Sequence, residues 1–206
     1  MPHASDPFFR TFHAVRIKGF AKAETIAEVA DLPLALVNEH LDALQLREWA
    51  MFREARQLWQ LTPVGREEYR IALAEDVGGR HLRVELEVPY AAFLEVNERF
   101  KELCGDWQLR DGHPNDHSDA DYDAAVVGRL QALDRDVAPI LQQMGEVLAR
   151  FTPYGPRLAR TCQRVVEGET NMFTGVMCGS YHDVWMELHE DLILSQGIDR
   201  ATEGSF

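Results

Sequence analysis

The chain has 206 residues, of which 46% are hydrophobic, so it is long enough to bury one or two cores. Its formal net charge of -13 at pH 7 excludes a protein that simply coats nucleic acid, because phosphate binding rewards Lys and Arg. No run approaches the roughly 20 apolar residues of a membrane helix, and the first residues lack the basic and apolar regions of a leader, so we expect a soluble, cytoplasmic protein with no membrane partner.

The charge is unevenly distributed along the chain. Residues 1–80 carry 10 Lys and Arg against 12 Asp and Glu, whereas residues 81–206 carry 11 against 22. Any contact with DNA is therefore expected from the first part of the chain.

The first third of the chain predicts three helices. Apolar residues at helical spacing indicate helices over residues 6–18, 22–30 and 33–46, with Gly19 ending the first and the sequence Asp31-Leu32-Pro33 forming the turn before the third. We expect the third helix to pack inward through one stripe and to leave the other residues exposed. The inward stripe is Val37, Leu41, Leu44 and Leu46, and the outward residues are Leu34, Ala35, Asn38, Glu39 and Asp42.

A β-hairpin and a further helix are expected next. Residues 49–53 and 58–61 have strand-like composition and are joined by the tight connection at residues 54–57. Thr62 can cap a helix that Pro63 begins, since proline in the first turn sacrifices no needed amide. This helix is expected to run to about residue 76. Gly78-Gly79 then marks the boundary between a domain of residues 1–78 and a domain of residues 79–206.

Over about residues 6–76 the chain resembles the winged helix-turn-helix of MarR-like bacterial transcription regulators. The residues that carry the resemblance are Ile26, Val29, Leu32, Val37, Leu41 and Leu44, then Leu61-Thr62-Pro63-Val64-Gly65-Arg66, followed by Tyr69. The resemblance implies a module of three helices and a β-hairpin wing that binds double-stranded DNA. Its third helix would enter the major groove and its wing would contact the neighbouring backbone or minor groove. The resemblance also implies a homodimer, because two-fold pairing supplies two half-sites.

Five residues are candidates for DNA contact under this interpretation. On the third helix, Asn38 can pair with adenine, and His40 is a second polar candidate. The basic candidates are Arg47 after that helix and Arg53 and Arg56 on the hairpin, where they can approach phosphates. An equally open interpretation is that Arg53 and Arg56 only protect a solvated edge strand by their charge.

Two positions depart from the family pattern. Glu39 stands where the family commonly has an outward Arg, and Asp42 lies one turn further on the same side. Carboxylates there repel phosphates. Glu48 stands where a Gly usually precedes the first wing strand, so we expect the turn either to cost about 1 kcal/mol or to change shape.

The second half predicts a helical bundle without resemblance to a family of known activity. Helices are expected over residues 89–104, 120–136 and 139–151, from Pro156 onward, and over residues 180–196, with Gly197 ending the last. Between the first two helices lies a loop with five Asp and two His, residues 111–123. It fails the EF-hand pattern, because Ala124 and Leu130 stand where Gly and Glu are required. Ser118 or Asp119 is expected to cap the next helix instead.

The last helix suggests a ligand pocket. One helical face carries His182, Trp185 and His189. This face is more polar than a typical core and more aromatic than a typical surface. With Trp107, Arg110 and His117 on an opposing wall, this face would bind a carboxylated or aromatic effector. The competing interpretation is that Trp185 belongs to the core and that each His caps a carbonyl or faces water. Asp183 is expected to cap the helix.

Arg157, Arg160 and Arg164 form a further stripe on the helix opened by Pro156. We expect salt bridges to Glu187, Glu190 and Asp191 on the last helix rather than an anionic ligand.

Catalysis is not indicated, and we expect no cofactor and no metal. The sequence has no HExxH motif, no nucleophile elbow and no phosphate-cradling glycine loop. The cysteines are widely spaced without a CxxC pair, which predicts reduced side chains.

The sequence as a whole therefore predicts a mainly α protein that regulates transcription: a winged helix for operator DNA, followed by an acidic helical domain for effector sensing or dimerisation. The alternative is a regulatory or protein-interaction module of a metabolic enzyme in which the winged helix does not bind DNA. A third, more remote hypothesis is a metal-dependent enzyme that uses His117, His182 and His189.

Overall fold

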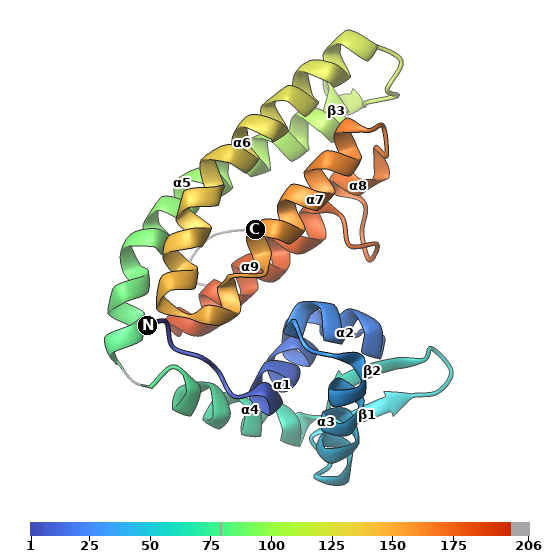
Figure 1. The fold of residues 1–206 in the computed structure, drawn as a ribbon. Coiled ribbons are helices and arrows are strands. Elements are labelled where there is room, and N and C mark those ends of the chain that lie inside the picture. The colour runs from blue at the N-terminus through green and yellow to red at the C-terminus, as the bar shows by residue number, and fades with distance from the viewer. Residues whose placement is uncertain (79, 199–206) are drawn as a thin grey trace.

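The computed structural model describes residues 1–78 and 80–198 and is mainly helical (Figure 1). The first part of the chain consists of three helices, an antiparallel hairpin and a fourth helix. These elements are α1 (Pro7–Lys18), α2 (Ala23–Ala30), α3 (Leu34–Leu46), β1 (Ala50–Arg53), β2 (Leu58–Leu61) and α4 (Pro63–Asp76). Within the described ranges, no helix is both long enough and apolar enough to cross a membrane.

Local capping fixes where these helices begin. The Asp6 carboxylate accepts hydrogen bonds from the first-turn amides of α1, at 2.8 Å from the Phe8 nitrogen, and Pro7 occupies the first helical position. Thr62 caps α4 in the same way, with its hydroxyl 2.9 Å from the Gly65 nitrogen. The predicted Thr62-Pro63 helix start is confirmed.

The segment before β1 keeps a left-handed residue. Glu48 has φ of 59°, so the backbone adopts the conformation that a glycine would take, and no change of shape is seen. Close approach also explains a glycine in α4, because a Cβ on Gly65 would lie 1.8 Å from the Trp49 carbonyl oxygen.

The core of the first part confirms most of the predicted inward stripe of α3. Val37, Leu41 and Leu44 are fully buried, together with Phe12 of α1. Leu46 was expected inward, and this prediction is wrong: its side chain is 87% exposed, because α3 ends at this residue and the chain turns away.

The second part is built on two long helices joined by a short hairpin. Its elements are α5 (Arg80–Gln108), β3 (Leu109–Arg110), β4 (His113–Pro114), α6 (Ala120–Val147), the 3-10 turn η1 (Ala149–Phe151), α7 (Tyr154–Val166), α8 (Asn171–Thr174) and α9 (Tyr181–Gln196). α5 and α6 run antiparallel, and α7 and α9 cover one side of the pair (Figure 1).

Two predicted helix boundaries in this part are wrong. The helix expected to begin at Pro89 already begins at Arg80, and the helices expected over residues 120–136 and 139–151 are one helix that passes through Pro139. An internal proline removes one backbone hydrogen bond. Packing between α5 and α6 compensates for this loss, since apolar side chains continue on both sides of each proline. On α5 these are Leu86, Phe93, Phe100 and Trp107, spaced every seven residues, and on α6 they are Leu130, Leu133, Val137, Leu141 and Met144.

The buried apolar side chains form two clusters. One is contributed by residues between Phe9 and Val77, and the other by residues between Leu86 and Leu192. Of the glycine pair predicted to separate two domains, Gly78 has φ of 63° and lies between the clusters, whereas Gly79 lies outside the described residues. Two separate domains remain a prediction, because Leu82 packs against both clusters.

Candidate functional site

The exposed face of α3 and the hairpin point away from α5, α6, α7 and α9 (Figure 1). On α3 the exposed side chains include Asn38, Glu39 and Asp42, as the sequence predicts. The turn between α2 and α3 is set by Asp31, which takes a left-handed conformation with φ of 51°. This turn places α3 across α1 and α2, and its polar side remains open.

The hairpin presents two arginines beside its tip. β1 and β2 pair in antiparallel register, from Ala50 opposite Leu61 to Arg53 opposite Leu58. Residues 54–57 form the connection. Arg53 and Arg56 are exposed, and neither has an ion pair with another of the described residues. The side-chain amide of Gln60 lies 3.0 Å from the Arg53 guanidinium, whereas Arg56 has no side-chain partner among the described residues and is open to an anionic partner.

The other two cationic or titratable candidates of this module are held by its own side chains. The Nδ1 atom of His40 lies 2.8 Å from the Thr11 hydroxyl, and partial burial lowers the pKa of His40. Arg47 stacks over the rings of Phe8 and Trp49, 5.1 and 5.5 Å from the ring centroids. Of the DNA-contact candidates outside the hairpin, Asn38 is therefore the one whose side chain is exposed and not held by another side chain of the described residues.

A groove of about 740 Å³ lies between the beginning of α2, α3 and the hairpin. The rings of Phe52 and Trp59, 5.2 Å apart, form part of its wall. Its charged lining residues are Lys22, Glu24, Asp42 and Glu54. The groove is therefore aromatic and carries an excess of negative charge.

Three of the predicted pocket residues gather at the tip of the α5–α6 pair. Trp107 is 4% exposed, and its ring packs between His117 and Phe173, with centroid distances of 4.6 and 5.0 Å. His117 also lies 3.0 Å from the Asp123 carboxylate. Arg110 pairs with the carboxylate of Asp119 at 2.8 Å. His117 and Arg110 are therefore both paired with carboxylates at the start of α6.

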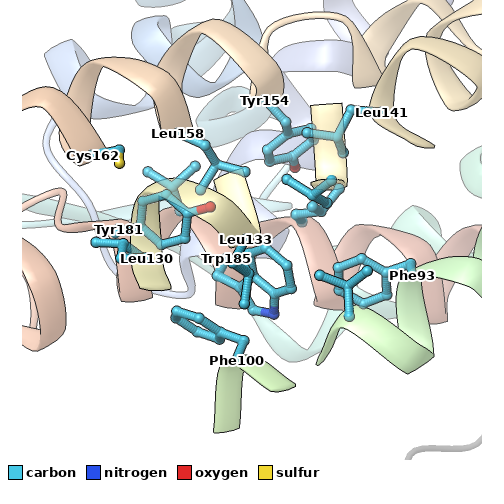
Figure 2. Close-up of a cluster of buried hydrophobic side chains, with 14 of the residues drawn as sticks. Phe93, Phe100, Leu130, Leu133, Leu141, Tyr154, Leu158, Cys162, Tyr181 and Trp185 are labelled. Atoms are coloured by element: carbon cyan, nitrogen blue, oxygen red, sulfur yellow. The ribbon is translucent and has the colours of Figure 1, made fainter. Parts of the chain in front are cut away.

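Trp185 belongs to the core between α5 and α9 (Figure 2). It is completely buried, and its ring contacts Phe100 and Phe93 with centroid distances of 4.5 and 5.1 Å. Its Nε1 donates to the Asn97 amide oxygen at 2.8 Å. The structure thus supports the core interpretation of Trp185, because ring partners from α5 pack directly against it.

The two histidines on the same helix lie against the same seam. His189 is 2% exposed and its ring centroid is 5.3 Å from that of Phe93. His182 is partly exposed and lies 6.2 Å from Phe100 by the same measure. The six predicted pocket residues therefore lie in two groups: Trp107, Arg110 and His117 at the tip, and His182, Trp185 and His189 in this seam.

Of the acidic residues expected to cap helices, Asp119 caps α6, but the prediction for Asp183 is wrong because the N-cap of α9 is Ser180. Asp183 accepts hydrogen bonds from the amides of Met177, Cys178 and Gly179 at 2.9 to 3.2 Å, and Ser180 caps α9. In the loop before α6, a backbone hydrogen bond from Tyr122 is the main cause that lowers the pKa of Asp119. The part of the chain that the structure describes contains no cluster of three His, Cys, Asp or Glu side chains able to hold a metal ion.

A buried ionic network that the sequence did not predict joins the two halves of the chain. Arg150 is buried beside two carboxylates, with its Nη1 2.6 Å from Asp76 of α4 and its Nε 3.3 Å from Asp191 of α9. Asp191 also lies 3.0 Å from the Nε2 of His13 and accepts a hydrogen bond from Tyr154 at 3.2 Å. Burial alone would raise the pKa of Asp191, but His13 and Arg150 outweigh it and hold this pKa well below its usual range.

Further ion pairs extend this junction along α9. Glu187 accepts from both Lys18 of α1 and Arg157 of α7, each at 2.6 Å, and Glu190 lies 3.0 Å from Arg16. The predicted salt bridge from Arg157 to the last helix is therefore confirmed.

For the other two arginines of this stripe the prediction is wrong. Arg160 pairs with Glu28 of α2, and Arg164 pairs with Glu169 at 2.6 Å. Arg160 lies opposite Glu28 of α2, and Arg164 lies in the last turn of α7, where Glu169 of the following segment is within reach.

No protein-family profile, no curated protein and no solved structure matches this chain.

Proposed function

We propose that residues 1–78 form a winged helix and that the chain is a DNA-binding regulator of transcription, followed by a helical bundle for dimerisation or effector sensing. The observation that carries this proposal is the orientation of the first part. α1 and α4 supply the residues of the buried junction, including His13 and Asp76, whereas α3 and the hairpin face outward. The free face is the one that a winged helix uses on DNA.

In the proposed complex, α3 enters the major groove and Asn38 reads an adenine edge. Arg53 and Arg56 contact phosphates on the flank. Glu39 and Asp42 oppose non-specific binding, because each places a carboxylate near the phosphate backbone. Useful affinity then depends on pairing two copies of the chain on two half-sites, so the proposed regulator is a homodimer. We propose that it acts in the cytoplasm.

Enrichment from a pool of genomic fragments tests this function. The purified full chain is incubated with fragments of its own genome at several salt concentrations, and bound fragments are sequenced. We expect a small set of fragments that share a two-fold repeated site, and we expect the Asn38→Ala variant to lose that enrichment. A pool recovered without any preferred fragment at low salt would contradict the proposal.

A second candidate function is binding of a basic segment of a partner protein. The groove between α3 and the hairpin favours it, because Glu24, Asp42 and Glu54 outnumber Lys22 there and Phe52 and Trp59 offer aromatic surface. Under this function the chain is an interaction module of a metabolic enzyme and does not bind DNA.

Tryptophan fluorescence with a synthetic peptide of alternating Arg and Leu separates the two candidates. Binding to the groove should change the emission of the wild-type chain and leave that of Trp59→Phe unchanged. Charge reversal by Asp42→Lys should weaken binding of the peptide but strengthen binding to DNA. A peptide response that is equal in the wild type and Asp42→Lys would exclude this groove as the binding surface.

A further inference from the structure

A cleft of about 640 Å³ separates the end of α2 from the beginning of α7. Its apolar walls come from both halves of the chain, with Leu32 and Pro33 on one side and Pro153 and Pro156 on the other. Its polar lining includes Glu28 of α2 and two arginines of α7, Arg157 and Arg160.

Arg157 brings an incompletely bonded guanidinium group to this cleft. Its side chain is only 8% exposed, and its NH2 is bonded to Glu187 at 2.6 Å. Its Nε is buried and has no hydrogen-bond partner among the described atoms. The Oε1 atom of Glu28 is 3.9 Å from this Nε, beyond hydrogen-bonding distance. Native structures seldom leave a buried donor unpaired without a reason.

Arg160 and Glu28 show what kind of group fits beside that donor. Arg160 pairs with the Glu28 carboxylate, and both side chains are about half exposed, at 57% and 50%. The same carboxylate oxygen therefore faces both arginines of α7. It is attached to α2, however, and does not reach the Nε of Arg157. A free carboxylate is not tethered in this way.

The start of α7 also borders the cleft, whose charged lining is balanced, with Glu28 and Asp31 against Arg157 and Arg160. This helix has 13 residues, and Pro153 at its N-cap offers no side-chain hydrogen bond to the amides of the first turn. Tyr154 and Gly155 carry the amides of this first turn, since Pro156 has none, and together with the helix dipole they favour an anion at this end.

From these contacts we propose that the cleft between α2 and α7 binds a small organic carboxylate. The ligand carboxylate accepts from the Nε of Arg157 and from Arg160 and displaces the Glu28 side chain. Its apolar body packs on Leu32, Pro33 and Pro153. Because Glu28 is on α2 and both arginines are on α7, the ligand replaces a direct link between the two halves of the chain. The proposed carboxylate site does not depend on the proposed function, since the chain would have the same cleft if it were a protein-interaction module.

Nuclear magnetic resonance titration with butyrate tests the site. The full chain, labelled with nitrogen-15, is titrated at constant ionic strength with butyrate and, separately, with the neutral isostere butyramide. We expect butyrate alone to shift the Arg157 Nε–H signal and the amide signals of Tyr154, Gly155, Arg157 and Leu158. The affinity for butyrate should rise about twofold to fivefold in Glu28→Gln, because this substitution removes a competing exposed ion pair. Arg160→Gln should weaken binding about tenfold.

Arg164→Gln is the matched control, because Arg164 lies one turn further along α7 in an exposed pair with Glu169. It should bind butyrate like the wild type. Three outcomes would overturn the proposal: equal shifts with butyrate and butyramide, weaker butyrate binding in Glu28→Gln, or an equal loss in the Arg160 and Arg164 variants. Inorganic phosphate is a further arm. A response to phosphate without one to butyrate would show a general anion site and would contradict the carboxylate assignment.

Discussion

The Asp191 carboxylate of α9 lies 3.0 Å from the imidazole of His13 on α1, and both side chains are almost completely buried. The same carboxylate is 3.3 Å from the Nε of Arg150, which also holds Asp76. One buried anion therefore links the first helix of the chain to the last.

Replacing Asp191 with Asn should destabilise the protein by about 3–5 kcal/mol, because Arg150 and His13 would lose a buried partner. Urea unfolding followed by circular dichroism measures the change. Asp136→Asn is the control, since Asp136 forms an exposed pair with Arg99 and should cost under about 1 kcal/mol. Similar losses in the two variants would mean that the junction contributes no more than a surface ion pair.

Stability should fall in acid, with Asp191 contributing to the loss. The pKa of Asp191 is held below its unfolded value of about 3.9, so its stabilising contribution is fully present above that pH and is lost as the pH falls further. Urea midpoints between pH 6 and pH 2 test this. We expect the curve of Asp191→Asn to be flatter than that of the wild type below about pH 4. Parallel curves would contradict the assignment.

Charge reversal on the hairpin tests the DNA proposal. Arg53→Glu combined with Arg56→Glu should weaken DNA binding on all sequences and lower its salt slope by about 2, one for each phosphate contact. Glu39→Arg should strengthen non-specific binding. Titration of a labelled duplex at several salt concentrations gives both quantities. An unchanged slope would place the hairpin away from DNA, and an unchanged non-specific affinity of Glu39→Arg would place α3 away from it.

Trp185→Phe should destabilise the protein by about 1–3 kcal/mol, since it reduces ring volume and leaves the buried Asn97 amide without its donor. Differential scanning calorimetry measures the loss. If the residue instead lined an open pocket, the same substitution would be nearly neutral for stability.

Glu48→Gly should stabilise the protein by about 1 kcal/mol, because Glu48 occupies a left-handed conformation that glycine adopts without steric cost. Its matched control is Glu54→Gly, in the hairpin connection and without a positive φ, which should be neutral or destabilising. Chemical denaturation of both variants decides the point, and a loss of stability in Glu48→Gly would contradict it.

Local structure could be predicted from the sequence because its causes are local. Helix starts at Pro7 and Pro63 follow from a side chain that caps the amides two or three residues later. The stop of α9 at Gly197 follows from a left-handed residue with φ of 68°. The buried stripe of α3 follows from the helical period. None of these depends on what the element packs against.

Only the tertiary structure decided how the two halves meet and where a ligand site arises. The sequence predicts that Asp191 pairs with an arginine of the helix opened by Pro156, yet Asp191 is buried beside Arg150, 41 residues away. Periodicity reports which way a side chain points and not which partner it meets there. Pro139 likewise ends a helix by local rules, whereas α6 continues through it because α5 packs along its length. These contacts join residues that are far apart in the chain, so no local pattern in the sequence predicts them.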